Sequence, residues 1–434
     1  MSISKRIPVR IKSASCSNCA EPFCAGYLGC PANKLIGSAI SAYQKGNLLE
    51  ALWFYRQVPL GSITGWVCPA FCQGSNLNQN DGCVKLHNNR NSNLNIKGIE
   101  RDIFEQAWQK KLIKPLLPQK KNNFSVAIIG AGPAGLSIAQ KLAQWGCEVS
   151  IFSREVGGLL KYGILKEHLP NKVLERELKF VFSHKIKFIN KILGKNIYLE
   201  DLKKKFKVVV LAIGFEKPRP LTDQKGNLIK IKSAKVIEGI EYLKYKRTNK
   251  AKTISVQNKK IIVIGGGATA WDSLLTARIE RAKYRLQLIR GDKDYYLGKL
   301  LYNCPYFNGN EAQLYDKREY EAVTQEIIQK KDDLEISYLQ KKTGKIIKQK
   351  VDLVIKSLGF LGPKLIEAGL DKKLIKIEKN GSIKPLLENE FSSKIKGLKN
   401  VYYLKDQGTV VGTVGKAMKT AQEIINDFKV PIYK

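Results

Sequence analysis

Two glycine-rich turns, each between an apolar strand and an amphipathic helix, most constrain the fold of this chain. The first lies in FSVAIIGAGPAGLSIAQKLAQWGCEVSIF, where Gly130, Gly132 and Gly135 take the glycine positions of a GxGxxG fingerprint. The first glycine permits the tight turn, the second lets a pyrophosphate approach the backbone, and the third lets the helix pack on the strand. A fingerprint within a complete strand–helix–strand unit predicts a dinucleotide site.

A second copy begins at Lys259, in KKIIVIGGGATAWDSLLTARIERAKYRLQLIR, with Gly265, Gly267 and Ala270 at the fingerprint positions. Two such sites in one chain favour a bound flavin dinucleotide and an exchangeable nicotinamide dinucleotide. A Rossmann fold that has lost its ligand is the alternative for either copy. Runs such as VVVLAIGF and IIVIGGG have the length and β-branching of buried parallel strands.

The residue after the second strand of each copy bears on the choice of dinucleotide. An acid there favours a free ribose 2′-hydroxyl, and arginine accommodates a 2′-phosphate. The second copy has Arg290, with Asp292 two residues later, and therefore favours NADPH, with NADH possible. The first copy has Ser153, and the nearest acid is Glu155, so the expected acid is missing or displaced.

Cysteines are concentrated near the N-terminus, with seven of nine in the first 83 residues. No signal peptide is expected, so the thiols stay reduced and favour metal over disulfides. Runs of close cysteines that end in Cys-Pro are typical of iron–sulfur clusters, whereas zinc commonly takes two close pairs. Seven thiolates are one short of the eight that two all-cysteine clusters need, so a second cluster would need a ligand of another kind. A zinc site and a site that no longer binds metal are the alternatives. The seven are Cys16, Cys19, Cys24, Cys30, Cys68, Cys72 and Cys83.

The charge is strongly basic, with 75 Lys and Arg against 38 Asp and Glu in 434 residues, or +37. Lysines are scattered along the chain among many Ile and Asn, all of which have A/T-rich codons, so we expect a generally basic solvated surface rather than a nucleic-acid site. No apolar run approaches the length of a membrane span. A cytoplasmic protein without a membrane or nucleic-acid partner is therefore expected.

Across nearly its whole length the chain resembles the small (beta) subunit of glutamate synthase, a flavin-containing electron-input module shared with dihydropyrimidine dehydrogenase. The motifs that carry the resemblance are CSNCAEPFC, GCPANKLI, WVCPAFC, LNIKGIERDI, GAGPAGL, GGLLKYGI, LAIG, GGGATAWD and DLVIKSLGFLGP, in the order found in the family.

The resemblance implies an α/β fold with two nested Rossmann-like dinucleotide-binding domains after a helical domain with two [4Fe-4S] clusters. The expected limits are 1–112 for the cluster domain, 122–250 and 366–434 for the FAD domain, and 251–365 for the NAD(P)H domain. The region 291–350 matches the family poorly and carries no functional interpretation.

The resemblance also implies site residues. Cys16, Cys19, Cys24 and Cys83 would hold one cluster. Cys30, Cys68 and Cys72 would hold the other, with Glu100 as its fourth ligand. FAD would bind at Gly130, Gly132, Pro133, Gly135, Gly157, Gly158, Leu159 and Asp406. The nicotinamide dinucleotide would bind at Gly265, Gly267, Ala268, Thr269, Ala270 and Arg290.

Several positions depart from the family pattern. The intervals from Cys24 to Cys30 and from Cys72 to Cys83 are longer than usual, which loops absorb at small entropic cost. Ala268 replaces a usual polar residue, Lys405 replaces the glycine before Asp406, and the usual Arg pair at the NADPH phosphate is reduced to Arg290-Gly291. Because of these departures, weaker cofactor binding than is usual in the family stays an alternative.

The leading function is the electron-input subunit of glutamate synthase, an NADPH-dependent FAD and iron–sulfur oxidoreductase serving a large subunit that makes glutamate from glutamine and 2-oxoglutarate. Alternatives are an NAD(P)H reductase that acts alone or with another redox partner, and a flavin-free iron–sulfur interaction protein. Hydride transfer needs aligned rings more than an acid or base. We therefore expect no catalytic residue, and His87, His168 and His184 are expected to be surface or packing residues.

Overall fold

The computed structural model describes residues 16–17, 19, 22–25, 29–73, 82–83, 86, 94–214, 217–229, 231, 233–248, 254–293, 314–363, 365–378, 383–405 and 407–432. The chain divides into two compact units. The first comprises Met1–Leu160, Glu167–Gly214 and Pro363–Lys434, and the second comprises Lys161–Lys166 and Phe215–Gly362. The four domain limits expected from the sequence stay a prediction.

Short helices form the N-terminal part of the first unit: α2 (Ile36–Gln44), α3 (Leu48–Arg56), α4 (Gly61–Val67), η1 (Phe71–Gln73) and α6 (Ile96–Gln109). The longest, α6, begins after Asn95, whose side chain accepts a hydrogen bond from the Gly98 N–H at 2.8 Å and caps the helix. One face of α6 buries Ile99, Ile103 and also Glu100, which is the only charged residue buried on that helix among the residues described. This face packs on α3 and α4.

The first unit is built on a parallel sheet of order β15-β4-β1-β2-β3. Its strands are β1 (Ser125–Ile129), β2 (Glu148–Phe152), β3 (Lys187–Ile189), β4 (Val208–Leu211) and β15 (Val401–Tyr403). The apolar run at Val208 is wholly buried, as a parallel strand covered on both faces should be. Because β15 comes from beyond residue 400 and pairs with β4, the chain returns to the first sheet after building the second unit.

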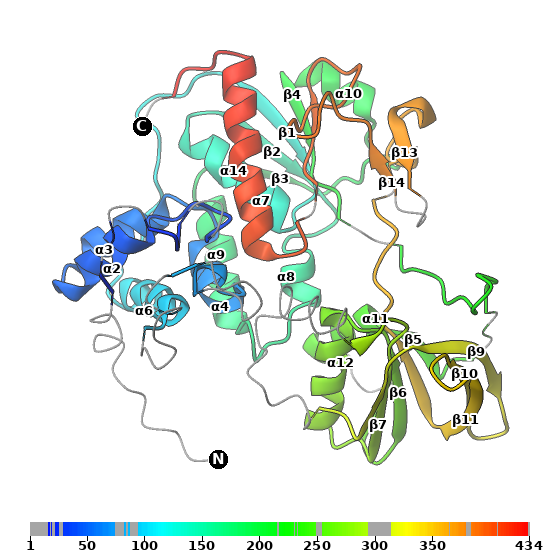
Figure 1. Ribbon diagram of the computed structural model, residues 1–434. Coiled ribbons are helices and arrows are strands. Elements are labelled where there is room, and N and C mark those ends of the chain that lie inside the picture. Colours follow the sequence, from blue (N-terminus) through cyan, green and yellow to red (C-terminus); the bar gives the residue numbers. More distant parts are fainter. Residues whose placement is uncertain are drawn as a thin grey trace. The chain divides into compact units, whose positions relative to one another are not determined.

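Between and after these strands the chain forms the helices α7 (Pro133–Gln144), α8 (Leu159–Tyr162), α9 (Asn171–Phe182), α10 (Leu199–Lys205) and α14 (Val410–Asp427). The C-terminal α14 lies beside α7, which in turn contacts β1 and β2 (Figure 1). A two-stranded antiparallel pair, β13 (Ile375–Ile377) and β14 (Ile383–Pro385), follows η4 (Lys372–Leu374). The segment 110–123 contains neither helix nor strand.

The second unit contains its own parallel sheet, of order β5-β12-β6-β7-β8. The strands are β5 (Val236–Glu238), β6 (Lys260–Ile264), β7 (Tyr284–Leu288), β8 (Lys317–Glu319) and β12 (Leu353–Lys356), with helices α11 (Gly239–Arg247) and α12 (Ala268–Ile279). A separate antiparallel sheet, β9 (Ala322–Gln329), β10 (Leu334–Gln340) and β11 (Lys345–Val351), lies largely within the region 291–350, which had no functional interpretation. Two parallel sheets in one chain, the first interrupted by the second, confirm the predicted α/β class of nested dinucleotide folds.

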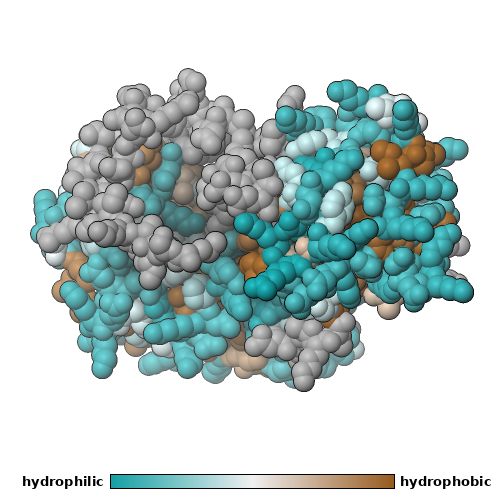
Figure 2. Space-filling view, turned by 90° about the horizontal axis from the view of Figure 1, so that it is seen from below, coloured by the Kyte–Doolittle hydropathy of each residue, from teal (hydrophilic) through white to brown (hydrophobic). Residues whose placement is uncertain are grey.

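On the face seen in Figure 2, the coloured residues are largely hydrophilic, with apolar residues in separate patches. None of the helices within the described ranges is both long and apolar enough to span a bilayer.

Candidate cofactor sites

The first fingerprint turn connects β1 to α7. Gly130 has φ +106°, and a Cβ at this position would lie 2.4 Å from the Ala212 carbonyl oxygen at the end of β4. A Cβ on Gly135 would lie 1.9 Å from the Gly130 carbonyl oxygen. Both positions therefore require glycine for backbone packing. A Cβ on Gly132, in contrast, would meet no atom within 4 Å, so the turn has open space at the position expected to face a pyrophosphate.

The N-terminus of α7 begins at this open position. Gly132 is its N-cap and Pro133 its first residue, and no side chain caps the helix or places an acid in its first turn. Pro133 lacks the N–H that would have no partner there, and the remaining free N–H groups and the helix dipole favour an anion. The turn thus fits a dinucleotide pyrophosphate by space, hydrogen-bond donors and charge.

Gly157 and Gly158 lie against the same turn. The Gly157 N–H donates to the Ala131 carbonyl oxygen at 2.8 Å, and both glycines have positive φ, +108° and +52°. A Cβ on Gly158 would lie 2.9 Å from Gly132 Cα. Leu159, the next residue, is about half exposed at the start of α8. The structure therefore brings these predicted FAD residues together, whereas Asp406 lies outside the described residues.

The position expected to recognise the flavin ribose is occupied by a turn. Ser153 Oγ donates to the Glu155 carbonyl oxygen at 3.0 Å, and Asn190 Nδ2 donates to the Arg154 carbonyl oxygen at 2.9 Å. The serine hydroxyl therefore orders its own loop, and the nearest acid in sequence is Glu155.

The second fingerprint turn repeats the geometry of the first. Gly265 has φ +132°, and a Cβ there would lie 2.2 Å from the Ser357 carbonyl oxygen. Gly267 precedes α12 as its N-cap and faces open space. Ala268 and Thr269 form the first turn of α12, and Ala270 is fully buried where the third fingerprint residue packs on the sheet. This turn also fits a dinucleotide.

Gln287 supports the second turn and was missed by sequence reasoning. It is fully buried on β7, where its Nε2 donates to the Gly265 carbonyl oxygen at 2.9 Å and its Oε1 accepts from Arg318 Nε at 2.7 Å. The signal available in the sequence was a lone glutamine in the apolar strand YRLQL. A buried amide must satisfy its hydrogen bonds, and this one does so by holding the glycine turn.

Arg290 lies two residues beyond β7, at the carboxyl end of the second sheet. Its guanidinium donates to the Thr222 carbonyl oxygen and, at 3.2 Å, to Thr222 Oγ1. The side chain remains exposed, and its bonded partner is a neutral threonine. An exposed guanidinium bonded to a neutral residue retains charge to attract a phosphate.

The thiols gather into two neighbouring groups. Thiol group 1 consists of Cys16, Cys19, Cys24 and Cys83. Burial raises the pKa of the Cys24 thiol to about 12, and the charges of Cys83, Cys16 and Cys19 contribute because these thiols lie near it. Cys19 is exposed and Cys24 is buried. Two backbone hydrogen bonds connect this group to the rest, from Cys30 N to Cys24 O at 3.0 Å and from Cys83 N to Cys72 O at 2.9 Å.

Thiol group 2 consists of the buried Cys30, Cys68 and Cys72. Burial raises the pKa of the Cys68 thiol to about 11, and the Ala70 N–H lies 3.3 Å from Cys68 Sγ. The charges of Cys68 and Cys30 contribute, after burial, to a strongly raised Cys72 pKa. Within the described ranges no three His, Cys, Asp or Glu side chains are grouped as ligands of a single metal ion.

Glu100 lies with thiol group 2 and is 5% exposed. Its Oε1 accepts hydrogen bonds from Thr64 Oγ1 at 2.8 Å and from Lys34 Nζ, which in turn donates to Thr64 Oγ1 at 2.7 Å. Lys34 is fully enclosed; burial disfavours its charge, yet Glu100, Cys30 and Cys68 leave its pKa raised. Both bonds occupy one carboxylate oxygen, so Oε2 is free of them. The sequence predicted Glu100 here and missed Lys34.

A buried hydroxyl also borders the two groups. Tyr55 is fully buried, and its Oη has no hydrogen-bond partner among the residues described. Burial and the charges of Glu100, Cys72, Cys30 and Cys24 raise its pKa well above the usual value. An uncompensated buried hydroxyl is costly, so the site fits a group that accepts a hydrogen bond. Soft thiolates, one carboxylate and this donor form a set suited to iron–sulfur clusters.

The histidines and the two cysteines beyond residue 83 have no assigned role in either cofactor site. His184 is buried and His168 is half-buried, and burial lowers the pKa of both, that of His168 to about 4. His87 and Cys304 lie outside the described residues. Cys147 is buried, with Asn122 Nδ2 3.6 Å from its Sγ.

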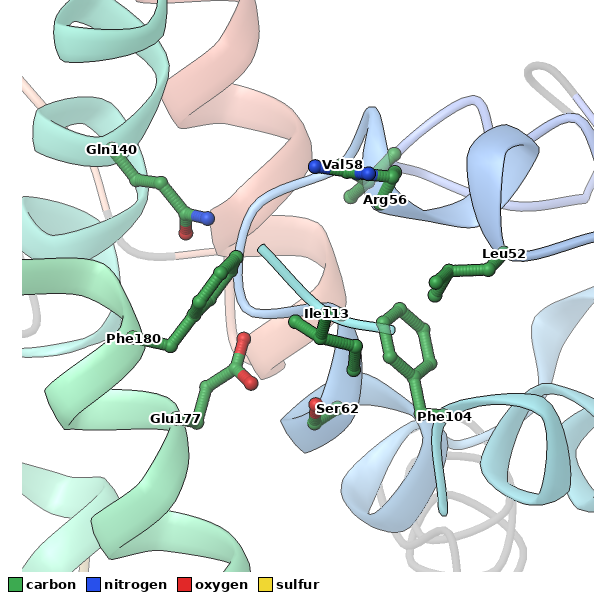
Figure 3. Close-up of a pocket in the computed structure, with 10 residues that line it drawn as sticks. Leu52, Arg56, Val58, Ser62, Phe104, Ile113, Gln140, Glu177 and Phe180 are labelled. Atoms are coloured by element: carbon green, nitrogen blue, oxygen red, sulfur yellow. The ribbon is translucent and has the colours of Figure 1, made fainter. Parts of the chain in front are cut away.

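A small cavity in the first unit is lined by no residue of the first glycine turn. Leu52, Phe104, Gln140, Glu177 and Phe180 are among its lining residues, and Figure 3 shows Glu177 and Phe180 of α9 directed toward Gln140 of α7 and Ser62 of α4. Its volume of about 10 Å³ suits one water at most. The cavity is therefore not a cofactor site.

Known proteins match the chain over the same regions. Residues 5–112 match the family described as dihydropyrimidine dehydrogenase domain II, 4Fe-4S cluster, and residues 124–289 match the pyridine nucleotide-disulphide oxidoreductase family. Thioredoxin reductase from T. acidophilum has a similar fold, with a TM-score of 0.51, 16% identity, and coverage of 71% of this chain and all of that one.

Three relatives share about a third of their aligned residues. The Bacillus subtilis glutamate synthase [NADPH] small chain is 34% identical, with 63% of this chain and 56% of that protein aligned. The Schizosaccharomyces pombe glutamate synthase [NADH] is 31% identical over 82% of this chain and 18% of that protein. The Geobacter sulfurreducens NADPH-Fe(3+) oxidoreductase subunit beta is 31% identical over 60% of this chain and 38% of that protein.

The two nested folds with their glycine turns and the preceding cysteine domain define a pyridine-nucleotide oxidoreductase with an iron–sulfur domain and a flavin or NAD(P) site. Within this class, the chain belongs to the family of flavin and iron–sulfur oxidoreductases that includes the small chains of glutamate synthase. The aligned part spans little more than half of the small chain from B. subtilis and less of the other two relatives.

Proposed function

We propose that the chain is the electron-input subunit of a glutamate synthase. It would oxidise NADPH with FAD and pass electrons through two [4Fe-4S] clusters to a large subunit that makes glutamate from glutamine and 2-oxoglutarate. The observation that carries the proposal is the presence, in one chain, of two thiol groups and two dinucleotide turns. The similarity to small chains of glutamate synthase supports the choice of partner.

At the first turn, FAD would contact the open backbone at Gly132 and the N-terminus of α7 through its pyrophosphate. Gly157 and Gly158 would allow the cofactor close to the backbone from the other side. The full set proposed for FAD is Gly130, Gly132, Pro133, Gly135, Gly157, Gly158, Leu159 and Asp406. The set proposed for NADPH is Gly265, Gly267, Ala268, Thr269, Ala270 and Arg290, with Arg290 on the 2′-phosphate and Gln287 fixing the turn.

Thiol group 1, Cys16, Cys19, Cys24 and Cys83, would ligate one cluster. Cys30, Cys68 and Cys72 would ligate the second together with Glu100, through Oε2. This assignment uses every cysteine of the N-terminal region and explains a carboxylate buried on an otherwise apolar helix face.

FAD bound at the first turn would supply hydride acceptance from a nicotinamide and one-electron donation to iron–sulfur clusters. The chain's own residues would bind and orient the two dinucleotides and the clusters. The glycine turns would hold two pyrophosphates, the buried Tyr55 hydroxyl could donate a hydrogen bond to a cluster, and Gln287 holds the second turn in place. We assign no general acid or base, because alignment of the rings rather than proton transfer controls this step.

A second candidate is a reductase of the same module with a different electron acceptor. The resemblance to a subunit of an NADPH-Fe(3+) oxidoreductase favours it. The two candidates share every site described above and differ only in the partner. Membership of an oxidoreductase family does not favour a flavin-free interaction protein.

The test begins with anaerobic purification and quantification of iron and flavin before and after NADPH is added. We expect about eight iron atoms and about one FAD per chain, with visible absorbance bleached by NADPH. Iron without flavin, or no bleaching, contradicts the proposal. The partner is then tested by adding a large glutamate synthase subunit from the same genome: NADPH-dependent glutamate formation supports the first candidate, and reduction of Fe(III) or a ferredoxin without it supports the second.

A further inference from the structure

A buried cation lies inside the region proposed to hold the second cluster. Lys34 is 2% exposed and comes between Cys30-Pro31 and the start of α2. Lysine almost never lies fully buried unless it is paired. Its partner here, Glu100, is 66 residues away in sequence on α6, and Thr64 of α4 completes a triangle of hydrogen bonds. Three separate elements therefore converge on this one ammonium group.

The thiols of group 2 surround the same position. Burial raises the pKa of the Cys30 thiol and the Lys34 charge opposes that rise, while the charges of both Cys30 and Cys68 favour protonated Lys34. A thiolate-ligated cluster carries net negative charge, and in a dry site a nearby cation stabilises each added electron more strongly than it would in water. Glu100 alone would add a further negative charge, and Lys34 offsets it.

We infer that Lys34 is a positioning residue for the second cluster: it fixes the Glu100 carboxylate so that Oε2 faces the metal, and its charge raises the reduction potential of that cluster. The inference rests on the proposed function, because it assumes the cluster held by thiol group 2. Thr64 hydrogen-bonds to both Lys34 and Glu100 and so fixes their positions, as a residue behind a metal ligand commonly orients that ligand.

Charge-balancing variants test the inference. Lys34→Met removes one positive charge, and we expect at least a tenfold shift in the reduction equilibrium of one cluster toward the oxidised form, or about 59 mV more negative for one electron. Glu100→Gln keeps an oxygen ligand and should shift that potential upward. The double variant Lys34→Met with Glu100→Gln should return it toward the wild-type value. The other cluster should change little throughout.

The measurement is a redox titration with dithionite and mediators, followed by electron paramagnetic resonance at low temperature and by iron content. It uses the full chain and requires neither NADPH nor a large subunit. Lys45→Met is the matched control, because Lys45 is exposed at the C-cap of α2 and its loss changes the net charge equally. Lys34→Arg keeps the charge and should restore the potential at least in part.

The outcomes separate this inference from the proposed function. Two clusters with unchanged potentials in Lys34→Met, together with a double variant whose potential equals that of Glu100→Gln, would overturn the role of Lys34 and leave the electron-input proposal intact. A wild-type chain that takes up no iron would overturn both. If Lys34→Met fails to fold because it leaves Glu100 unpaired, the double variant still decides: a potential equal to that of Glu100→Gln, rather than to the wild type, contradicts an electrostatic role for Lys34.

Discussion

Gly132 and Gly135 lie in the same turn but have different surroundings. Substitutions at the two positions should therefore affect cofactor binding and protein stability separately. An added Cβ at Gly132 meets no protein atom, and its φ of −81° suits any residue. We expect Gly132→Ala to fold with nearly unchanged stability and to lose most of its FAD, because the methyl group enters the space proposed for the pyrophosphate. Flavin content and the unfolding temperature of the flavin-free protein measure the two effects.

The contrasting variant is Gly135→Ala, whose Cβ would lie 1.9 Å from a backbone oxygen. We expect it to lower the free energy of unfolding by about 1–3 kcal/mol, since backbone must shift. Equal loss of stability in the two variants would contradict these separate roles.

Arg290 is expected to set the preference between the two nicotinamide dinucleotides. A charge-assisted hydrogen bond to the 2′-phosphate contributes about 1.5–3 kcal/mol, so Arg290→Ala should lower kcat/KM for NADPH about 10- to 150-fold. The value for NADH, which has no such phosphate, should change little. Steady-state kinetics with an artificial acceptor measures both, and Lys293→Ala is the control for a nearby exposed cation. An equal loss with both substrates would assign Arg290 a structural role.

Glu177 makes stability depend on pH. Burial raises the pKa of its carboxyl to about 7 from an ordinary 4.5, despite hydrogen bonds from Ser62. The folded protein therefore holds this proton more tightly than the unfolded chain. The resulting stabilisation is complete below about pH 4.5 and is lost as the pH rises through about 7. Glu177→Gln should remove the loss and raise the free energy of unfolding at pH 8 by up to about 3 kcal/mol.

Denaturant unfolding at pH 5 and pH 8 provides the check for Glu177. The two proteins should differ little at the lower pH. Glu175→Gln, at an exposed position of the same helix, is the control and should behave as wild type at both. A difference that is the same at both pH values would rule out titration of Glu177 as the cause.

Residue identity predicted the two glycine turns, because few other residues meet their backbone requirements, and the cysteine ligands stay a prediction. Gly130 and Gly265 have positive φ at a crowded turn, a conformation that a glycine in the sequence indicates directly. Lys34 and Gln287 could not be predicted, since a lysine or glutamine is usually exposed and nothing in the local sequence reveals burial. Their roles depend on partners distant in sequence: Glu100 for Lys34, and Gly265 and Arg318 for Gln287.

At the scale of elements, the C-terminal α14 reaches the cysteine region. A Cβ on Gly415, in the middle of α14, would lie 2.1 Å from the Pro31 carbonyl oxygen and 3.2 Å from Ala32 Cα. The helix and the loop after Cys30 therefore touch through backbone. Gly415→Ala must push that loop away, and we expect a loss of about 1–3 kcal/mol of stability with lower iron content in the second cluster.

Iron content, the resonance signals of each cluster and thermal unfolding together measure the effect of Gly415→Ala. Lys419→Ala, on an exposed position of α14, is the control. Full iron content with unchanged stability in Gly415→Ala would mean that the loop adapts freely and that α14 does not support the cluster site.

The parallel strands were predictable because VVVL and KIIVI are short, β-branched and bounded by glycine turns. The antiparallel sheet β9–β11 was not predicted, although LEISYLQ alternates buried and partly buried residues along β10. Such alternation is a signal of a half-exposed strand. It was obscured by the lysine-rich composition of β11, where exposed and partly buried residues alternate almost to its end.

At the scale of the whole molecule, each unit has its own hydrophobic core. One core centres on Ala127, Val209, Leu211 and Tyr403 of the first unit, and another on Tyr242, Ile261, Val263 and Leu274 of the second. The order of the two units along the chain was predictable from the two fingerprints. The contribution of residues beyond 400 to the first sheet followed only from the family resemblance, because β15 is three residues long.

Separate cores imply that the two units unfold in separate steps and that each responds to its own ligand. A ligand that binds only folded protein stabilises it by RT ln(1 + [L]/Kd), about 2.7 kcal/mol at 100 times Kd. NADP⁺ should therefore raise the unfolding temperature of one transition, that of the unit with Gly265, and leave the flavin-releasing transition in place. Calorimetry combined with flavin fluorescence during heating distinguishes the two. Arg290→Ala should reduce the shift with NADP⁺ to about half or less, without altering either transition in its absence. A single transition that releases flavin and moves with NADP⁺ would show instead that the units unfold together.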